Sequence, residues 1–234
     1  MDMGMFLISA VGFIIAIVCW FQIHDKKKGI YTIESFPKHK ISEILGTVNS
    51  GFIQNAIIRG RVVSDNPLQS DLSQSNCVFY EMEVVRKYSV TEEEKTETGE
   101  RKRKTSTKNE RIAHNVRQTD FYLDDGTGQI KISLNDADFE KQQVVNKYET
   151  VNQGIPIIDS NINLSYGNFH LDLSRASQER TLGYEYREWI IPLNSEVFVA
   201  GGIKKDSEMY FSCPDDNRFK YIISFLQESE FIQK

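Results

Sequence analysis

The feature that most constrains this chain is an apolar run close to its N-terminus. Residues 3–23 read MGMFLISAVGFIIAIVCWFQI and contain no charged side chain. At about 1.5 Å per residue, a helix of this length rises roughly 30 Å, which matches the hydrocarbon thickness of a bilayer. Such a segment must therefore be buried, either in lipid or inside a protein core.

We expect this run to be a retained transmembrane helix. The alternatives are a cleaved signal peptide and a buried core helix. A signal peptide begins with a basic region and ends at a small-residue cleavage site, whereas Asp2 is the charged residue before this run and Trp20 and Phe21 lie at its end. A core helix would carry polar residues at helical spacing, and few interrupt this one.

Three lysines set the expected orientation of the helix. Lys26, Lys27 and Lys28 follow the run, and neither lysine nor arginine precedes it. Loops rich in lysine and arginine stay on the cytoplasmic side of a membrane. We therefore predict a single-pass membrane protein that contacts the bilayer through residues 3–23, with its N-terminus outside and its remaining residues in the cytoplasm.

The sequence divides into three predicted segments. Residues 1–28 form the anchor and its basic flank. Residues 29–52 form a juxtamembrane connector, in which the apolar residues of 38–50 recur at helical spacing and predict a short amphipathic helix. This helix either lies on the membrane or packs on the domain, and packing on the domain is the commoner outcome. Residues 53–234 are expected to form one β domain.

Short, turn-separated runs of alternating residues predict the β domain. Residues 124–128 read Asp-Asp-Gly-Thr-Gly, and Asp-Gly favours the tight turn of a β-hairpin. Few helical patterns separate the strands, which argues against βαβ units. We expect an all-β fold with short flanking helices, an antiparallel barrel or sandwich of which an OB-like five-stranded barrel is one form. Strands are predicted at 56–64, 77–90, 118–123, 129–134, 161–173, 184–191, 196–201 and 209–213, and 184–191 is expected to pair with 196–201.

Two segments depart from this pattern. Residues 91–117 are almost devoid of apolar side chains, which predicts an exposed charged loop or the tip of a long hairpin. Their basic block, residues 101–104, either contacts anionic lipid headgroups or is compensated by the glutamates that precede it. In residues 218–231, apolar side chains recur at i, i+3, i+4 and i+7 from Phe219, and this spacing predicts a C-terminal helix.

No residue pattern indicates a reaction. The four histidines, His24, His39, His114 and His170, are scattered, and none has metal-ligand spacing. Neither a nucleophile elbow nor a phosphate-binding loop occurs. The formal net charge of −5 argues against a basic nucleic-acid binder. We predict no catalytic, cofactor-binding or metal-binding residue and no cofactor, and the net charge disfavours a nucleic-acid partner.

Several motifs follow one another in an order that resembles a known family. R-G-R-V begins at Arg59, N-C-V-F-Y-E-M-E-V at Asn76, T-D-F-Y-L-D-D-G-T-G-Q-I-K-I at Thr119, and G-Y-E-Y-R-E-W-I-I-P-L-N-S-E-V-F-V-A-G at Gly183. Preceded by an apolar helix, this series resembles the GIDE domain, also called the "beside a membrane" domain. That domain is found in membrane-anchored RING-type E3 ubiquitin ligases of mitochondria and plastids and in prokaryotic relatives. The resemblance covers about residues 33–232.

Departures from the family pattern limit what the resemblance implies. A RING finger needs eight Cys or His ligands in paired spacing, and the part after the apolar run has two cysteines, Cys77 and Cys213, which we expect to be free thiols. The family's zinc ligands and ligase activity are therefore carried over to no residue here, and we expect this chain to lack the RING finger. The turn at residues 192–195 also has Asn-Ser where the family shows Gly and an acidic residue.

We therefore expect an interaction module that binds a protein or lipid partner at the membrane, without catalysis of its own. The identity of the protein partner does not follow from the sequence. One alternative is an E3-ligase-like component of a ubiquitination-type system or of membrane organisation, which the resemblance implies. A second alternative is a membrane-tethered, OB-like nucleic-acid binder.

Overall fold

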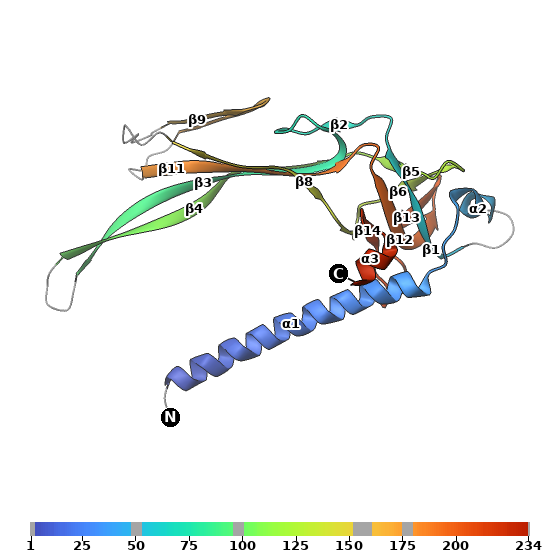
Figure 1. The fold of residues 1–234 in the computed structure, drawn as a ribbon, viewed down its shortest axis with the longest axis horizontal. Coiled ribbons are helices and arrows are strands. Elements are labelled where there is room, and N and C mark those ends of the chain that lie inside the picture. The colour runs from blue at the N-terminus through green and yellow to red at the C-terminus, as the bar shows by residue number, and fades with distance from the viewer. Residues whose placement is uncertain (1–2, 48–52, 96–100, 152–160, 175–179, 234) are drawn as a thin grey trace. The chain divides into compact units, whose positions relative to one another are not determined.

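The computed structural model describes most of the chain (Figure 1). The β domain expected at residues 53–234 is in fact divided between two compact units. The second unit consists of the segments inserted between strands of the first. The described residues are 3–47, 53–95, 101–151, 161–174 and 180–233. The first unit comprises Met1–Val63, Asp120–Glu140 and Asn194–Lys234, and the second comprises Ser64–Thr119 and Lys141–Leu193.

The first unit is built on a closed β barrel. Strand β1 (Asn55–Val63) pairs with β5 (Phe121–Asp124) on one side and with β12 (Glu196–Lys205) on the other. Strand β5 pairs with β6 (Gln129–Ile132), which runs parallel to β13 (Met209–Ser212), and β13 pairs in turn with β12. The circuit β1-β5-β6-β13-β12-β1 leaves no free edge among these five strands, and it is the arrangement of an OB-type barrel. Of the two predicted forms, the barrel is present, with one parallel pair, β6–β13, where antiparallel pairing was expected.

One long helix covers part of the outside of this barrel. Helix α1 spans Met3–Ser35, so residues 29–35, expected in the connector, are helical and continue the same helix. The helix ends just before Pro37, because a proline disfavours helical geometry in the residue that precedes it. Its last turn packs Ile33 and the following Phe36 against the outer side chains of β1 and β12. The buried members of this cluster are Ile33, Phe36, Ile57, Phe198, Ala200 and Ile222.

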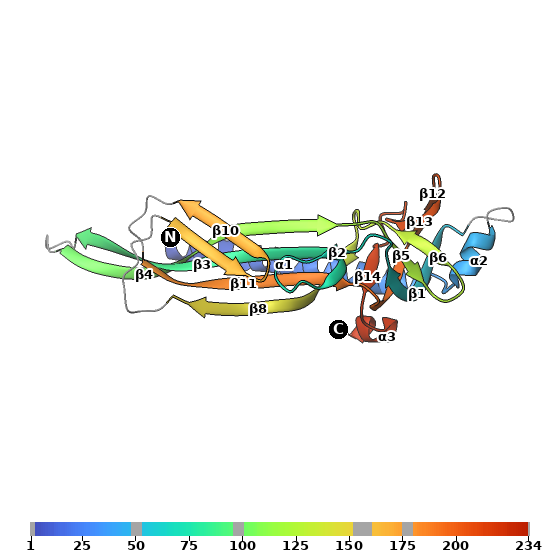
Figure 2. The ribbon, with the colours of Figure 1, turned by 90° about the horizontal axis from the view of Figure 1, so that it is seen from above.

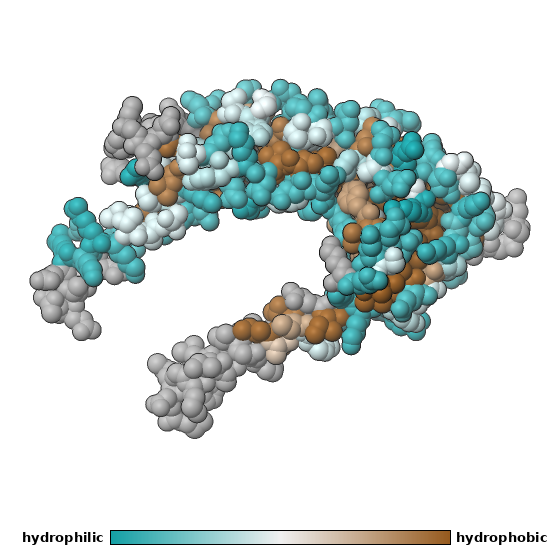
Figure 3. All heavy atoms as spheres, in the orientation of Figure 1, coloured by the Kyte–Doolittle hydropathy of each residue, from teal (hydrophilic) through white to brown (hydrophobic). Residues whose placement is uncertain are grey.

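The middle of α1, over residues 15–20, presents apolar side chains to solvent. Ile15, Val18 and Trp20 are all exposed, Trp20 by 60%, and Figure 3 shows apolar spheres along this helix. Within the residues whose side chains are described, no helix is long and apolar enough to cross a membrane. The transmembrane helix at residues 3–23 stays a prediction from the sequence.

The expected amphipathic helix is present in a shorter form. Helix α2 spans Ile41–Gly46, and residues 48–50 of the predicted segment lie outside the described part. Ile41 and Ile44 are fully buried. The apolar face of α2 therefore packs on the domain, which is the expected alternative to lying on the membrane.

The predicted helix at residues 218–231 is wrong. This region forms strand β14 (Ile222–Ser224) and a short helix, α3 (Glu228–Gln233). Four consecutive residues, 221–224, are buried, because β14 lies between β12 and β7 (Asp138–Phe139) and forms ladder hydrogen bonds with both. In a strand that is buried on both faces, apolar and polar side chains need not alternate. The apolar residues of β14 therefore fell at a spacing that is also typical of a helix.

A long antiparallel sheet forms the second unit. Its central strands are β3 (Asn76–Lys95) and β11 (Arg180–Pro192), with β8 (Gln142–Thr150) beside β11 and β4 (Arg101–Gln118) beside β3. The sequence patterns did not predict β8. The short β2 (Leu68–Gln69) pairs with the beginning of β3.

A hairpin covers one face of this sheet. Strands β9 (Asn161–Tyr166) and β10 (Phe169–Ser174) lie over β3 and β11 in both views (Figures 1 and 2). Leu164, Tyr166 and Phe169 pack against the core there, and the Tyr166 ring stacks on Tyr186 with centroids 4.7 Å apart. The buried members of the core are Leu72, Cys77, Tyr80, Met82, Val84, Val145, Tyr184, Tyr186 and Ile190.

Two further expectations are corrected by the sheet registers. Residues 91–117 are mostly strand, because β3 and β4 pair from Phe79↔Gln118 to Lys95↔Arg101. The charged loop is therefore wrong for most of this segment, and the long hairpin is confirmed. Segments 184–191 and 196–201 do not pair, because β11 and β12 belong to different sheets. Asn194 between them has φ 64°, and its N–H donates to Val62 O instead of closing a hairpin.

Candidate interaction site on the barrel

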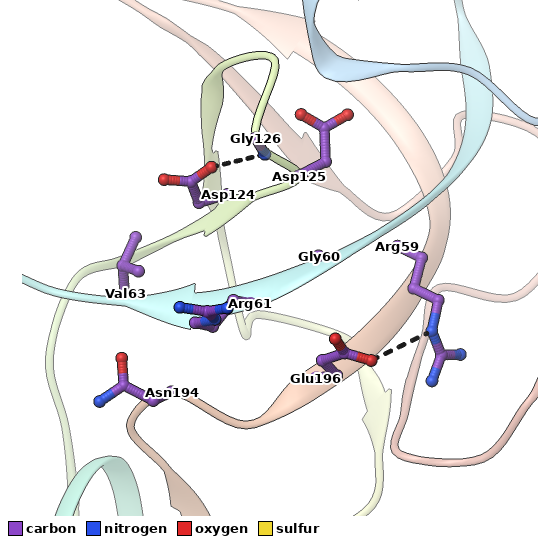
Figure 4. Close-up of a pocket in the computed structure, with 9 residues that line it drawn as sticks. All are labelled: Arg59, Gly60, Arg61, Val63, Asp124, Asp125, Gly126, Asn194 and Glu196. Atoms are coloured by element: carbon purple, nitrogen blue, oxygen red, sulfur yellow. Dashed lines mark hydrogen bonds and ion pairs between the residues drawn. The ribbon is translucent and has the colours of Figure 1, made fainter.

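A polar cavity of about 490 Å³ opens on the surface of the barrel unit (Figure 4). Its walls come from β1, from the β5–β6 turn and from the beginning of β12. The cavity is lined by Arg59, Gly60, Arg61, Val63, Asp124, Asp125, Gly126, Asn194 and Glu196.

Strand registers bring the charges of this cavity together. Arg61 lies opposite Glu196 on one neighbouring strand and opposite Asp124 on the other. Arg59 donates a hydrogen bond from Nη1 to Leu226 O at 3.2 Å, and its Nε lies 3.9 Å from Glu196 Oε2. Two arginines and three acidic residues, Asp124, Asp125 and Glu196, thus line the same cavity. The sequence motifs did not identify this site, because residues far apart in sequence meet only through strand pairing.

Gly60 allows the close crossing of strands under the cavity. A Cβ atom at this position would lie 2.8 Å from the carbonyl oxygen of Asp124, which is too close for any side chain. The glycine of the R-G-R-V motif therefore has a steric role where β1 meets β5.

The first aspartate of the Asp-Asp-Gly-Thr-Gly turn stabilises the turn itself. Its Oδ1 accepts a hydrogen bond from Gly126 N at 2.8 Å, and its Oδ2 accepts one from Gln129 Nε2 at 3.0 Å. Both hydrogen bonds lower the pKa of Asp124, and the one from the Gly126 backbone has the larger effect. Gly126 has φ 80°, a conformation that glycine adopts without strain. The predicted hairpin is confirmed, and the Asp124 carboxylate accepts hydrogen bonds within it.

The second aspartate of the turn holds the beginning of α2. Asp125 Oδ2 accepts a hydrogen bond from Ile41 N at 2.9 Å, and Thr127 Oγ1 accepts one from Ser42 N at 3.2 Å. A turn distant in sequence thus satisfies two N–H groups that open a helix. Burial alone would raise the pKa of Asp125, but the hydrogen bonds from Thr127 and Ile41 outweigh it and lower the pKa.

Replacing Asp125 with asparagine is expected to destabilise the barrel unit by about 1 kcal/mol at pH 7, because asparagine keeps one of the two oxygens that accept from Ile41 N and Thr127 N and loses the negative charge near the start of α2. The folded-state pKa lies below the ordinary value of 3.8. The stabilisation is therefore complete above that value and is lost as the pH falls through the folded-state pKa. Urea unfolding at pH 7 and at about pH 3 checks this, with the difference from wild type shrinking at low pH.

The matched control for this prediction is Asp172→Asn, which changes an exposed aspartate on β10 of the other unit. It is expected to leave the urea midpoint unchanged at both pH values. A difference between wild type and Asp125→Asn that stays constant down to about pH 3 would contradict a charge-dependent cap.

The outer face of β5, β6 and β13 is the face on which OB barrels commonly bind oligonucleotides. Here a row crosses the strands in which Lys131 lies between Tyr122 and Tyr210. Lys131 Nζ lies 3.0 Å from Asp120 Oδ2 and 3.2 Å from Glu208 Oε1. The hydrogen bonds that Lys131 donates to Asp120 and, second, to Glu208 raise the pKa of Lys131. A nucleic-acid phosphate would meet these carboxylates, so the charge on this face disfavours the nucleic-acid alternative.

The basic block on the β3–β4 hairpin is paired with glutamates. Arg101 Nη1 and Arg103 Nε each lie 3.5 Å from a carboxylate oxygen of Glu93. The strand register also places Lys104 opposite Glu92. These cross-strand pairs reduce the net charge that residues 101–104 offer to a lipid surface. The anionic lipid contact at this block stays a prediction.

The thiols and histidines lie in separate environments. Cys77 and Cys213 are free thiols, as expected. Burial raises the pKa of Cys77 to about 12, which suppresses the reactive thiolate. His39 Nδ1 lies 3.1 Å from Glu43 Oε2, and His114 Nε2 lies 3.2 Å from Glu81 Oε1. Over the described ranges, no three His, Cys, Asp or Glu side chains form a group that could hold a metal ion.

Comparison with known proteins assigns the family. A family model described as GIDE, E3 ubiquitin ligase, matches residues 90–234, which is more than half of the 234-residue chain. The match includes the Asp-Asp-Gly-Thr-Gly turn and the barrel strands β5, β6, β12 and β13. Neither the curated proteins nor the solved structures gave a match. The chain therefore belongs to the GIDE family, the family described as E3 ubiquitin ligase.

Proposed function

We propose that this protein is a membrane-anchored interaction module of a ubiquitin-ligase-type system. Its barrel is held at the bilayer, on the cytoplasmic side that Lys26, Lys27 and Lys28 predict. There it binds a protein partner without catalysis of its own. Membership of the GIDE family supports the ligase context, and the construction of α1 carries the proposal of an anchor.

That single observation is the contrast between two stretches of α1. In the middle of the helix, Ile15, Val18 and Trp20 are exposed apolar side chains, which soluble surfaces rarely gather on one helix. At its C-terminal end, Ile33 is 7% exposed and the following Phe36 is 6% exposed, both packed on the barrel. One continuous helix therefore joins an apolar segment to the folded barrel.

Polar contacts support the docking of the C-terminal end of α1. Lys220 N donates a hydrogen bond to Thr32 Oγ1 at 2.8 Å. The Tyr31 ring stacks on Phe219 with centroids 5.3 Å apart. Such contacts restrict the hinge between helix and barrel, so that a helix set in a bilayer would also orient the barrel. Confinement to the membrane surface raises the effective concentration of the barrel for other membrane components.

Two surfaces are proposed for the protein partner. The cavity beside Arg59 and Arg61 offers donors and carboxylates to a peptide of mixed charge. The β3–β4 hairpin offers β4, whose outer side chains are mostly exposed and whose pairing within the described sheet is with β3 alone. An edge strand of this kind can accept an added strand from another protein.

The anchor is tested with full-length protein and neutral liposomes. Wild type is expected to float with the vesicles and to resist carbonate extraction. The variant Ile15→Asp/Val18→Asp is expected to remain with the soluble fraction, because each aspartate near the centre of a span costs about 3 kcal/mol. The control Ile15→Leu/Val18→Leu keeps the segment apolar and should float. Wild type that washes off in carbonate would overturn the proposal.

The partner surfaces are tested by crosslinking from intact membranes. Arg61→Glu reverses a charge in the cavity. A second variant replaces residues 91–105 with Asn-Gly, which shortens the hairpin at the pair Val90↔Ser106. Loss of specific captured proteins, ubiquitin-conjugating or RING proteins among them, from one variant assigns the contact to that surface. An unchanged set from both variants would contradict both surfaces.

A further inference from the structure

We infer that α1 and the barrel together form a binding site for the phosphate of an anionic phospholipid headgroup. The site is a cavity of about 520 Å³ between the C-terminal third of α1 and the segment before β14. It is separate from the basic block at residues 101–104, and it rests on the proposed anchoring of the chain in a membrane. Its lining consists of His24, Lys27, Lys28, Tyr31, Asn217 and Arg218.

The cations of this site come from two distant parts of the sequence. Lys27 and Lys28 lie on α1, and Arg218 lies on the barrel side. The carboxylate beside them is that of Asp216, whose Oδ2 lies 2.6 Å from Arg218 Nη2. The hydrogen bond from Arg218 lowers the pKa of Asp216, so this carboxylate is ionised at neutral pH. Three cations against one carboxylate leave the cavity positively charged.

Fixed contacts shape the cavity before any ligand enters. Lys28 Nζ donates a hydrogen bond to Asn217 O at 3.1 Å. The Arg218 backbone N–H and side chain both bind Asp216, so the guanidinium group cannot turn away freely. Lys27 makes no hydrogen bond or ion pair with any residue that the structure describes, and it remains available to a ligand. Lys28 and Arg218 are held before the phosphate binds, and Lys27 is the side chain that binding would order.

The neighbouring lysine, Lys26, belongs to different surroundings. It lines a separate cavity that also contains Asp25, Asp138 and Glu140. The acidic side chains there would repel a phosphate group. Adjacent lysines of one helix therefore face opposite electrostatic environments, and the three-lysine cluster of the sequence is not one uniform basic patch.

The position along α1 favours a lipid over free phosphate. The apolar run ends at residue 23, and residues 24–31 extend the helix by roughly 10 Å beyond it. This distance places the cavity at the level of the headgroup layer when the run spans the hydrocarbon core. Trp20 is exposed and stacks on His24 with ring centroids 5.4 Å apart, as an aromatic residue at the membrane interface would be placed. Acyl chains attached to a phosphate held at Lys27 would continue along this apolar surface.

The test uses the full chain in neutral detergent micelles and measures bound lipid by native mass spectrometry. The probes are dioctanoyl phosphatidic acid, dioctanoyl phosphatidylcholine and inorganic phosphate. Wild type is expected to retain the anionic lipid in preference to the other two. Lys27→Gln should weaken that retention about fivefold, the effect of one lysine near an anionic lipid. The matched control Lys26→Gln removes an equal charge one residue away and should leave retention unchanged.

Three results would overturn the site. Equal losses in Lys26→Gln and Lys27→Gln would indicate unspecific charge attraction. If inorganic phosphate binds as well as phosphatidic acid, the ligand of the site is not specifically a lipid. If phosphatidylcholine binds as well, the net charge of the headgroup is not what the site recognises. Flotation with neutral liposomes distinguishes this failure from failure of the anchor, because flotation does not depend on Lys27. Unchanged thermal unfolding of both lysine variants confirms that they are folded.

Discussion

Replacing Glu188 with alanine is expected to lower the free energy of unfolding of the sheet unit by about 3–5 kcal/mol, which is the usual cost of removing one partner from a buried charged network. Glu188 lies on β11 and is completely buried. A change of this size is a large fraction of the stability of an ordinary domain.

The reason is that the Glu188 carboxylate accepts hydrogen bonds from several donors of the segment at residues 70–75. Glu188 Oε1 accepts hydrogen bonds from Ser70 Oγ at 2.9 Å and from Ser73 Oγ at 2.6 Å and Ser73 N at 3.0 Å. Its Oε2 accepts one from Leu72 N at 2.7 Å. Without the carboxylate, these donors lose their partner, and those that stay buried pay their desolvation cost in full. Leu72, a member of the core, would lose the contact that holds its backbone.

Urea unfolding measures the cost, and hydrogen exchange locates it. Amides of β3 and β11 are expected to lose protection in Glu188→Ala, whereas those of β1 and β12 belong to the other compact unit and should change less. The control Glu149→Gln alters a glutamate whose side chain is 40% exposed and should cost less than about 0.5 kcal/mol. A cost below about 1 kcal/mol for Glu188→Ala would contradict the role given to this network.

Replacing Phe198 with alanine is expected to destabilise the barrel unit by about 3–5 kcal/mol, because it deletes a large buried ring. Phe198 is completely buried on β12. It packs in the cluster that contains Ile33 and Phe36 at the end of α1. It also contacts the Phe231 ring of α3 edge-on, with centroids 5.9 Å apart. The cavity left by alanine would therefore open beneath the helix.

Phe198→Ala should also loosen the docked end of α1. Hydrogen exchange is expected to rise at residues 28–36, and urea unfolding should give the overall cost. Phe198→Leu keeps much of the volume and should cost less, whereas Val116→Ala, at a position that is 46% exposed, should cost almost nothing. Unchanged exchange at residues 28–36 would mean that the Thr32–Lys220 hydrogen bond holds the helix without the apolar cluster.

Local patterns predicted the elements whose neighbours follow closely in the chain. The Asp-Asp-Gly-Thr-Gly hairpin was predictable because its turn chemistry and both strands lie within a few residues. The β1 and β12 segments were found from β-branched, turn-bounded runs. The OB-like barrel was foreseen as one form of the fold, but its closure depends on pairing between β1 and β12, which are separated by more than a hundred residues.

The functional residues were less predictable. Arg61, Glu196 and Asp124 lie in different strands, and only the register makes them neighbours. The lysine cluster was read as one signal for orientation, whereas Lys26 and Lys27 line different cavities. Arg218 was included in the predicted C-terminal helix and instead precedes β14.

By itself, the sequence determined the β character of the chain, its apolar N-terminal run and the Asp-Asp-Gly-Thr-Gly turn, because these depend on side chains that are close together along the chain. The tertiary structure alone decided the division into two units, the strand conformation at residues 222–224, the docking of α1 and the grouping of charges in the three cavities. The physical reason is that burial and strand pairing are satisfied by residues distant in sequence, and a short apolar run such as Tyr221–Ile223 fits a helix or a strand until its partners are present.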